Sequence, residues 1–243
     1  MLENSHRLLL LKRRPYRDSE DMVEGFSSRL DRFSAVVRRG RLGGGGLMEP
    51  PVLVNASLSS SSGLSTLSQP VLENSFSGLR KDLARLATAG FLGRLFLASA
   101  PEKVGEGQLF ALLEELFVAL NEGVLPIACG LWGQHRLLLS LGVAPELDCC
   151  LICGTLEVSG FSAEEGGVLC EACYRGKGFA VSATALETGR ALRDLPLGDE
   201  TVEFGPLSEL GRIYKEQFQV HLGVPDSVFR RVLPRPRGKR DIP

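Results

Sequence analysis

Four cysteines past the middle of the chain have the spacing of metal ligands. Two Cys-x-x-Cys pairs, Cys150/Cys153 and Cys170/Cys173, stand with sixteen residues between them. Each pair places two sulfur atoms on one side of a tight turn, and Gly154 helps to form the first of these turns. Four thiolates suit a tetrahedral Zn²⁺ ion. The spacing therefore predicts a zinc site with these four cysteines as its ligands.

A zinc ion with four cysteine ligands has no free position, so the spacing predicts a structural site. Catalytic zinc usually has three protein ligands and a water molecule. The sequence lacks the His-x-Glu motif that precedes Pro-Cys-x-x-Cys in nucleobase deaminases, and it lacks a thioredoxin-like context for redox chemistry. Between Cys150 and Cys173 the chain has four Glu residues and no Lys or Arg, so this segment should repel phosphate. We interpret residues 147–176, the cysteine clip, as a staple.

The other thiols and the imidazoles show no arrangement typical of catalysis. Cys149 adjoins a predicted ligand and is the alternative to Cys150 at the metal. Cys129 lies in an apolar helical pattern and is expected in the core. His135 and His221 have no acid or nucleophile at a recognisable spacing, and we expect both to be structural. We therefore predict no catalytic residue and a protein that is not an enzyme.

Composition is that of an ordinary globular protein. The chain has 243 residues, of which 44% are hydrophobic and 23% charged, enough for one large core or two smaller ones. The apolar run at residues 8–11 ends at Lys12 and is too short for a signal peptide or a membrane span. Six cysteines, four of them in metal-ligand spacing, fit a reducing compartment. We expect a cytoplasmic protein with no membrane contact.

Charge is distributed unevenly along the chain, although the net charge is only −1. Residues 1–46 have ten Lys and Arg against six Asp and Glu, and residues 227–243 have six against one. The segment between them carries a net charge of −10. This asymmetry is typical of a protein that holds a polyanion at particular surfaces, although each cluster also fits an ordinary solvated face.

The first 78 residues have the pattern of a small β-barrel of the OB type. Val52, Val54, Ala56 and Leu58 alternate at period two, which is typical of a half-buried strand. Turn-forming residues separate such segments, as in the glycine run 43–46 and the serine-rich turn 60–63. Five short strands are predicted, at residues 6–12, 22–30, 32–42, 52–58 and 64–72.

Beyond residue 78 the apolar period changes to that of helices. Leu79, Leu83, Leu86 and Ala87 fall on one face of a helix predicted over residues 79–96. Further helices are predicted within residues 108–120, 127–142, 182–195 and 205–223. The fold class is therefore α+β, with an OB-fold barrel at 1–78, a helical domain at 79–146 and 177–243 that ends in a basic tail, and a zinc-binding insertion at 147–176.

Cations cluster at two places in the predicted barrel, and small OB barrels bind single strands across one face. Aromatic residues are scarce there, so binding should depend on counterion release with little sequence preference. Arg190 and Arg193, three residues apart on a predicted helix, either extend this surface or simply face solvent. The predicted DNA-binding residues are Lys12, Arg13, Arg14, Arg17, Arg38, Arg39, Arg41, Arg190 and Arg193.

Several stretches resemble the RecO family of bacterial recombination mediators. RRPYRDSED and SAVVRRGR are similar to the first and third strands of that family's barrel. GLWGQHRLLLSLGVAPELDCCLICG is similar to its helix-to-zinc junction, and FSAEEGGVLCEAC to its second knuckle. The resemblance covers nearly the whole chain. It implies an N-terminal OB barrel, a helical domain and, in many members, a zinc module.

The resemblance also implies a function and partners. Members bind single- and double-stranded DNA, anneal complementary strands and, with RecR, help to load the RecA recombinase. They contact the acidic, hydrophobic C-terminal tail of the single-stranded-DNA-binding protein through the helical domain. The expectation is thus a nucleoid-associated DNA repair mediator with structural Zn²⁺. The alternative is a zinc-stapled adaptor that docks proteins and binds no nucleic acid, which DNA binding at physiological salt would exclude.

Overall fold

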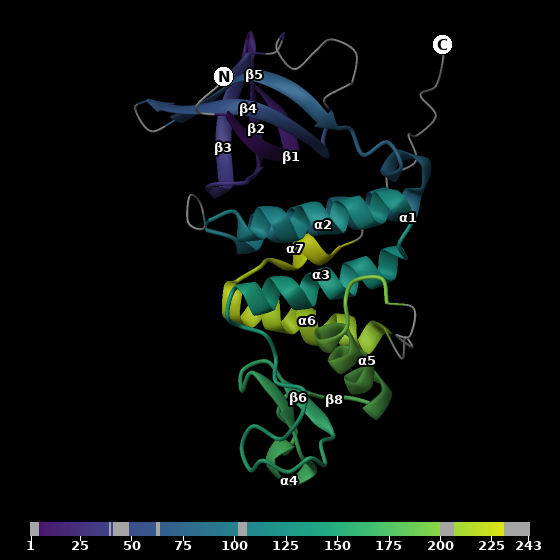
Figure 1. Cartoon of the computed structure of the whole chain (residues 1–243). Helices are drawn as coiled ribbons and strands as arrows, with labels where there is room; N and C mark the ends of the chain where they lie inside the picture. The colour runs from purple at the N-terminus through teal and green to yellow at the C-terminus, as the bar shows by residue number, and fades with distance from the viewer. Residues whose placement is uncertain are drawn as a thin grey trace, which may run out of the picture.

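The computed structural model describes residues 5–38, 40, 49–61, 64–101, 106–199 and 207–230. Arg39, Arg41, the glycine run 43–46 and the basic tail after residue 230 lie outside these residues. Figure 1 shows a barrel of strands at one end, a group of helices in the middle and the cysteine clip at the other end. The predicted α+β class is confirmed, whereas the domain boundaries stay a prediction.

The closed barrel contains five strands in the order β1-β2-β3-β5-β4. They are β1 (Ser5–Arg17), β2 (Glu20–Ser27), β3 (Asp31–Arg38), β4 (Val52–Ser61) and β5 (Leu64–Asn74). Neighbouring strands are antiparallel except β3 and β5, which are parallel. The predicted OB-like barrel is confirmed. Its first strand is longer than predicted because residues 13–17 continue to pair with β2, which confines the turn to Asp18 and Ser19.

Strand residues are buried on both sides of the barrel wall. Val52, Val54 and Ala56, predicted by their alternation, point into the barrel with Leu8 and Val37, and none of these five is exposed. Successive side chains of a strand point to opposite faces, so the residues between them point outward. Part of this outer face is also apolar and buried, and its residues are Leu9, Phe26 and Leu53.

Helices follow the barrel along the chain, and α1 and α2 cover that outer side. The helices are η2 (Leu79–Lys81), α1 (Leu83–Ser99), α2 (Gln108–Glu122), α3 (Pro126–Ser140), α5 (Ala183–Asp194), α6 (Leu207–Leu222) and α7 (Asp226–Phe229). Phe26 of the barrel packs edge-on against Phe96 of α1, with ring centroids 5.9 Å apart. Figure 1 shows α1 and α2 directly beside the barrel. None of the described helices combines the length and the apolar character that crossing a membrane requires.

The face predicted for the first helix is wrong. Asp82 interrupts the predicted helix and begins α1 as its N-cap, accepting a hydrogen bond from the backbone N–H of Arg85 at 3.0 Å. Leu83, Leu86 and Ala87 of α1 are exposed, and Leu79, which lies in η2, is the one residue of the predicted set that is buried. The buried residues of α1 are Ala89, Leu92, Gly93, Leu95 and Phe96.

A barrel carboxylate begins α2. Asp31, the first residue of β3, is 3% exposed and accepts hydrogen bonds from the backbone N–H groups of Leu109 (3.0 Å) and Phe110 (3.2 Å). Burial raises the pKa of Asp31, and the backbone hydrogen bonds oppose this effect. The contact is close because Gly107, at φ +81°, leaves room that a Cβ atom would fill at 2.2 Å from the Ser28 carbonyl oxygen.

Ionic contacts fix the same junction. Arg7 of β1 lies 2.9 Å from Glu73 of β5 and also pairs with Glu114 of α2. Arg32 of β3 donates a hydrogen bond to the carbonyl oxygen of Ala100 at 3.1 Å. The barrel and the helices are therefore joined by polar contacts at several points around a shared apolar core.

Removing the Asp31 carboxylate should destabilise the chain. Asp31→Ala leaves the first N–H groups of α2 without an acceptor in a buried place, and the loss of an N-cap costs about 1–2 kcal/mol. A decrease of that size is expected in the free energy of unfolding from a urea titration. Asp18→Ala, in the exposed turn between β1 and β2, should change it by less than about 0.5 kcal/mol. Equal stability of the two variants would contradict the role of Asp31.

Candidate metal centre and nucleic-acid surface

The sulfur atoms of Cys150, Cys153, Cys170 and Cys173 all lie within 4.8 Å of one another. Those of Cys153 and Cys170 are 3.6 Å apart. A tetrahedral ion with Zn–S bonds of about 2.3 Å requires sulfur atoms about 3.8 Å apart. The structure therefore brings all four predicted ligands together in a cluster that can hold a metal ion.

Each knuckle of the clip is a tight turn closed by backbone hydrogen bonds. In the first, the N–H of Cys150 donates to the Thr155 carbonyl and the N–H of Gly154 donates to the Cys150 carbonyl, both at 2.8 Å. In the second, the N–H of Tyr174 donates to the Cys170 carbonyl at 2.8 Å. The clip contains β6 (Gly160–Ser162), β7 (Gly167–Leu169) and α4 (Glu171–Tyr174), and β6 also pairs with β8 (Phe179–Ala180), which follows the clip.

The knuckle backbone favours a thiolate at one of the four positions. Burial raises the pKa of the Cys150 thiol, but hydrogen bonds from backbone N–H groups outweigh it and lower that pKa to about 6. Hydrogen bonding to the Cys170 thiol, together with burial, raises the pKa of Cys173 to about 12. Four neighbouring thiolates need a cation to offset their repulsion, so metal binding here must release protons.

The other cysteines and a core histidine lie away from this cluster. Cys149 is half-buried and is not one of the four clustered residues. Cys129 is buried in α3, as expected for a core residue, and burial raises the pKa of its thiol to about 12. His135 is buried against Tyr214, whose hydroxyl lies 3.4 Å from Nδ1, and burial lowers the pKa of this imidazole to about 4. Cys129 and His135 are thus packed in the core, as expected for structural residues.

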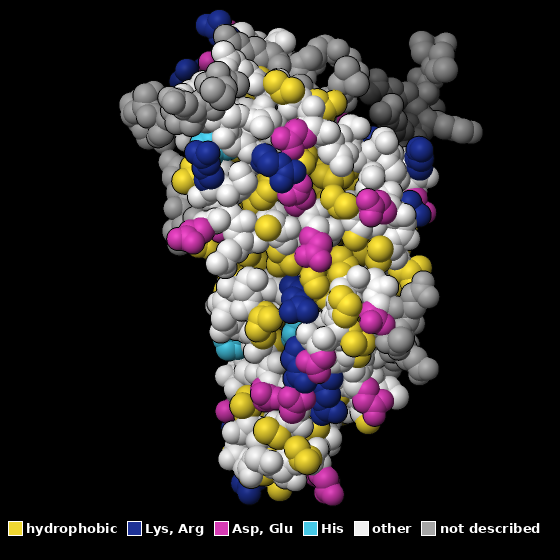
Figure 2. All heavy atoms as spheres, in the orientation of Figure 1, with side chains coloured by type: hydrophobic (Ala, Val, Ile, Leu, Met, Phe, Trp, Pro, Cys, Tyr) yellow, Lys and Arg dark blue, Asp and Glu magenta, His cyan; other side chains and the backbone are white. Residues whose placement is uncertain are grey.

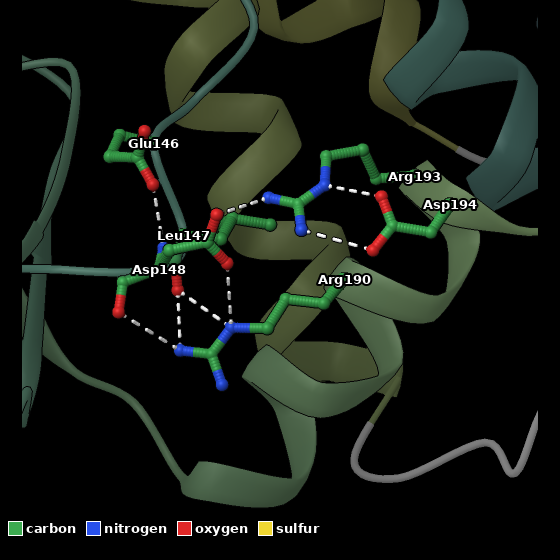
Figure 3. Close-up of polar contacts among 6 residues, drawn as sticks. All are labelled: Glu146, Leu147, Asp148, Arg190, Arg193 and Asp194. Carbon is green, nitrogen blue, oxygen red and sulfur yellow. Dashed lines mark hydrogen bonds and ion pairs between the residues drawn. The ribbon is translucent and has the colours of Figure 1, made fainter. Parts of the chain in front are cut away.

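Two arginines of α5 hold the segment that leads into the clip (Figure 3). Arg190 donates from Nε and Nη2 to the Leu147 carbonyl oxygen at 3.0 and 2.6 Å, and its Nε lies 3.2 Å from Asp148 Oδ1. Arg193 lies 2.7 Å from Asp148 Oδ2 and 2.8 Å from Asp194 Oδ1. The extension of the DNA surface to these arginines stays a prediction, but their observed contacts connect the clip to the helices.

Further contacts join the clip to its surroundings. Nε2 of His221 in α6 lies 2.7 Å from the carbonyl oxygen of Ala163 in the clip. The N–H of Val168 donates to the Glu146 carbonyl at 3.0 Å, at the point where the chain enters the clip. The sequence does not indicate that Leu147 and Asp148 are partners of these arginines, because residues that pair across 43 or 45 positions leave no local pattern.

One part of the barrel surface places predicted DNA contacts on the two strands that flank β2. Arg17 of β1 and Arg38 of β3 both stand opposite Glu20 of β2 in the strand register. Arg17 lies 3.7 Å from Glu20 and its side chain is 68% exposed. Arg38 is exposed and forms no ion pair with the part of the chain that the structure describes. Exposed ion pairs contribute about 0–1 kcal/mol, so a phosphate can replace the carboxylate at little cost.

The remaining barrel cations divide into two kinds. Lys12 and Arg14 are exposed and share Glu24, at 3.2 and 3.7 Å. Arg13 is instead mostly buried, 2.8 Å from the buried Asp21. Lys12 and Arg14 are therefore available to a ligand, whereas Arg13 has a partner inside the protein. The predicted contacts Arg39 and Arg41 lie outside the described residues.

Aromatic stacking on this surface is limited to one ring. The barrel segment has four aromatic residues, of which Phe26, Phe33 and Phe76 are at most 1% exposed. Tyr16 is 41% exposed, and the guanidinium of Arg17 lies 5.1 Å from the centre of its ring. The expected scarcity of stacking groups is thus increased by burial, which leaves charge as the main means of contact.

Comparison with known proteins connects these features to a family. The family model described as "Recombination protein O C terminal" matches residues 80–227. The DNA repair protein RecO of Exiguobacterium sibiricum is 33% identical over 125 residues, and that of Bacillus velezensis is 33% identical over 133 residues. The chain spans about half the length of these two relatives, at 50% and 52%. The DNA repair protein RecO of Anaeromyxobacter sp. is 31% identical over 176 residues, 69% of each chain.

Loss of two ligands should remove the metal and lower stability. Cys150→Ser with Cys170→Ser is expected to reduce bound zinc from about one ion per chain to near zero. The melting temperature measured by circular dichroism should fall by on the order of 10 °C, because the ion joins two distant turns. Cys149→Ser is the control and should keep both the metal and the melting temperature. Loss of metal from that control would instead show that Cys149 is a ligand.

Loss of Arg190 should loosen the clip and leave the affinity for DNA unchanged. Arg190→Ala leaves the buried carbonyl oxygen of Leu147 without its donor, which should cost about 1–2 kcal/mol given the partial exposure of the arginine. Hydrogen exchange within residues 147–176 is expected to accelerate. Arg230→Ala, in an exposed ion pair with Asp226, should change neither the free energy of unfolding nor the hydrogen exchange of the clip. Weaker DNA binding with unchanged hydrogen exchange would instead favour the predicted DNA contact.

Proposed function

The chain belongs to the RecO family of DNA repair proteins, and on this premise we propose that it is a DNA-binding recombination mediator. In this proposal the protein binds single- and double-stranded DNA and anneals complementary strands. With RecR it helps to load RecA onto DNA that is covered by single-stranded-DNA-binding protein. The family assignment supports a role in DNA repair and recombination, and the finer steps are inferred from the resemblance.

The exposed cationic part of the barrel, formed by Lys12, Arg14, Arg17 and Arg38, carries this proposal. Phosphates that replace the weakly held carboxylates there would release counterions from the DNA, which drives binding without regard to sequence. With one exposed aromatic ring, the surface has little means of reading bases. Such indifference suits annealing, because a protein that pairs any two complementary strands must hold the backbone and leave the bases free.

Zn²⁺ at the four cysteines is proposed as a structural cofactor. Its bond lengths fit the observed cluster, and the ion would join the two knuckles and neutralise part of the thiolate charge. We assign it no part in binding DNA, because the segment from Cys150 to Cys173 contains Glu157, Glu164, Glu165 and Glu171 and no Lys or Arg. The ion instead keeps the clip folded, while the contacts of Arg190 and Arg193 keep it attached to the helices.

The remaining partners rest on the resemblance. RecR and the C-terminal tail of the single-stranded-DNA-binding protein are the proposed protein partners, with the tail at the helical domain. We propose no catalytic step, since the cysteine cluster leaves no free position on a bound ion and His135 is enclosed in the core. A zinc-stapled adaptor that binds no nucleic acid is the competing proposal, and DNA affinity distinguishes the two.

Removing two cations from the barrel should weaken binding of single-stranded DNA. Arg17→Gln with Arg38→Gln should lower the affinity and reduce the slope of log K against log[salt] by about 1.4, or about 0.7 for each phosphate that the protein no longer neutralises. Fluorescence anisotropy with a labelled oligonucleotide measures both quantities. Arg230→Gln, at an exposed arginine directly after α7, is the matched control. Unchanged affinity in the double variant would reject the barrel contact.

Annealing separates a mediator from a passive DNA-binding protein. In a gel assay with complementary oligonucleotides covered by the coat protein, the wild-type chain should accelerate duplex formation, and the Arg17→Gln/Arg38→Gln variant should lose most of this effect. If the chain fails to bind DNA at physiological salt, the adaptor proposal holds instead.

A further inference from the structure

The first knuckle of the clip exposes large apolar side chains. Leu151, Ile152 and Leu156 are 46%, 54% and 77% exposed. Figure 2 shows hydrophobic side chains on the surface of this end of the molecule, with acidic side chains among them. A monomeric protein rarely gathers such side chains in one place unless they meet a partner. The clip has its own small buried cluster around Cys150, Leu169 and Cys170, which does not include them.

A hollow next to Leu156 is acidic and not apolar. It encloses about 510 Å³ and is lined by residues 155, 157–159 and 170–172. The carboxylates of Glu157 and Glu171 belong to this lining, one from each knuckle, and neither forms an ion pair with the part of the chain that the structure describes. A Lys or Arg side chain matches the hollow, since its charged end can meet the two carboxylates while its methylene groups pack on Val158.

Charge excludes DNA from this surface. No Lys or Arg occurs between Cys150 and Cys173, and Glu165 is the residue whose charge is compensated, by Lys177 at 3.0 Å. Four thiolates around a divalent ion would add further negative charge. A phosphate backbone would therefore be repelled, whereas a basic protein segment would be attracted.

The surface is held in place before any partner arrives. Arg190 and Arg193 fix the chain where it enters the clip, and His221 contacts the clip from α6. Little conformational freedom is left to lose when a partner binds, which favours affinity. Figure 1 also places the clip at the end of the molecule opposite the barrel, so a partner on the clip would leave the barrel open.

We propose that this knuckle surface, formed by Leu151, Ile152, Leu156, Glu157 and Glu171, docks a segment of another protein in which a Lys or Arg adjoins apolar side chains. The cation enters the hollow between Glu157 and Glu171. Its apolar neighbours cover Ile152 and Leu156. DNA on the barrel and a protein on the clip then occupy the molecule together.

A labelled hexapeptide of alternating Leu and Arg, titrated into the zinc-loaded full chain and followed by anisotropy, tests the proposal. Glu157→Gln with Glu171→Gln should weaken its binding at least tenfold, and Leu156→Ser should weaken it several-fold. Glu115→Gln with Glu122→Gln, which removes two exposed carboxylates from α2, is the matched control and should bind as the wild type does. Zinc content and circular dichroism confirm that each variant is folded.

Four results would overturn the proposal. Three concern the peptide: absence of binding, equal binding of a Ser-Arg hexapeptide, or unchanged binding in the Glu157→Gln/Glu171→Gln variant. The fourth is cross-linking of an oligonucleotide to residues 147–176, because the clip would then bind nucleic acid. None of these results depends on the barrel contact, so failure here is distinguishable from failure of the DNA-binding proposal.

Discussion

The apolar outer side of the barrel determines how the rest of the chain is arranged. Leu9, Phe26 and Leu53 are buried there, and burial of each such side chain is worth about 1.5–3 kcal/mol, so this side must be covered. The helices α1 and α2 cover it, and Asp31 and Arg7 fix the position of α2. The later part of β1 is more exposed and carries cations. One strand thus contributes to the core at its start and to the proposed DNA surface at its end.

The clip joins the main core through Leu147, Phe161 and Val168, but its cysteine end has few buried apolar residues of its own. Its own cluster consists of Cys150, Leu169 and Cys170 with a few half-buried neighbours. Small modules of this kind depend on a metal or a disulfide for stability. Here the four cysteines can bind a metal ion inside the clip, and Arg190 and Arg193 of α5 attach the clip to the helices. The clip can therefore present exposed leucines and isoleucine without losing its shape.

Local patterns predicted those parts of the fold that depend on local repetition. The alternation at Val52, Val54 and Ala56 predicted a strand, and the cysteine spacing predicted the cluster. The face of α1 was wrong because its exposed side also carries leucines, Leu83 and Leu86, so apolar spacing alone did not identify the buried side. The sequence could not predict that Asp31 caps α2 or that Arg193 pairs with Asp148, since such pairings join positions far apart and depend on how whole elements pack. The same limit applies to Arg13, whose buried partner distinguishes it from Lys12 and Arg14.

The covered side of the barrel also has a consequence for synthesis on the ribosome. The barrel strands end at Asn74, but the helix that Asp31 caps ends only at Glu122. At about 5–20 residues per second, the uncovered apolar side would face solvent for on the order of 2 to 10 seconds. A nascent chain in that interval resembles an aggregation-prone intermediate. Chaperone binding to the partly made protein would be expected to centre on Leu9, Phe26 and Leu53 and to end when α2 docks.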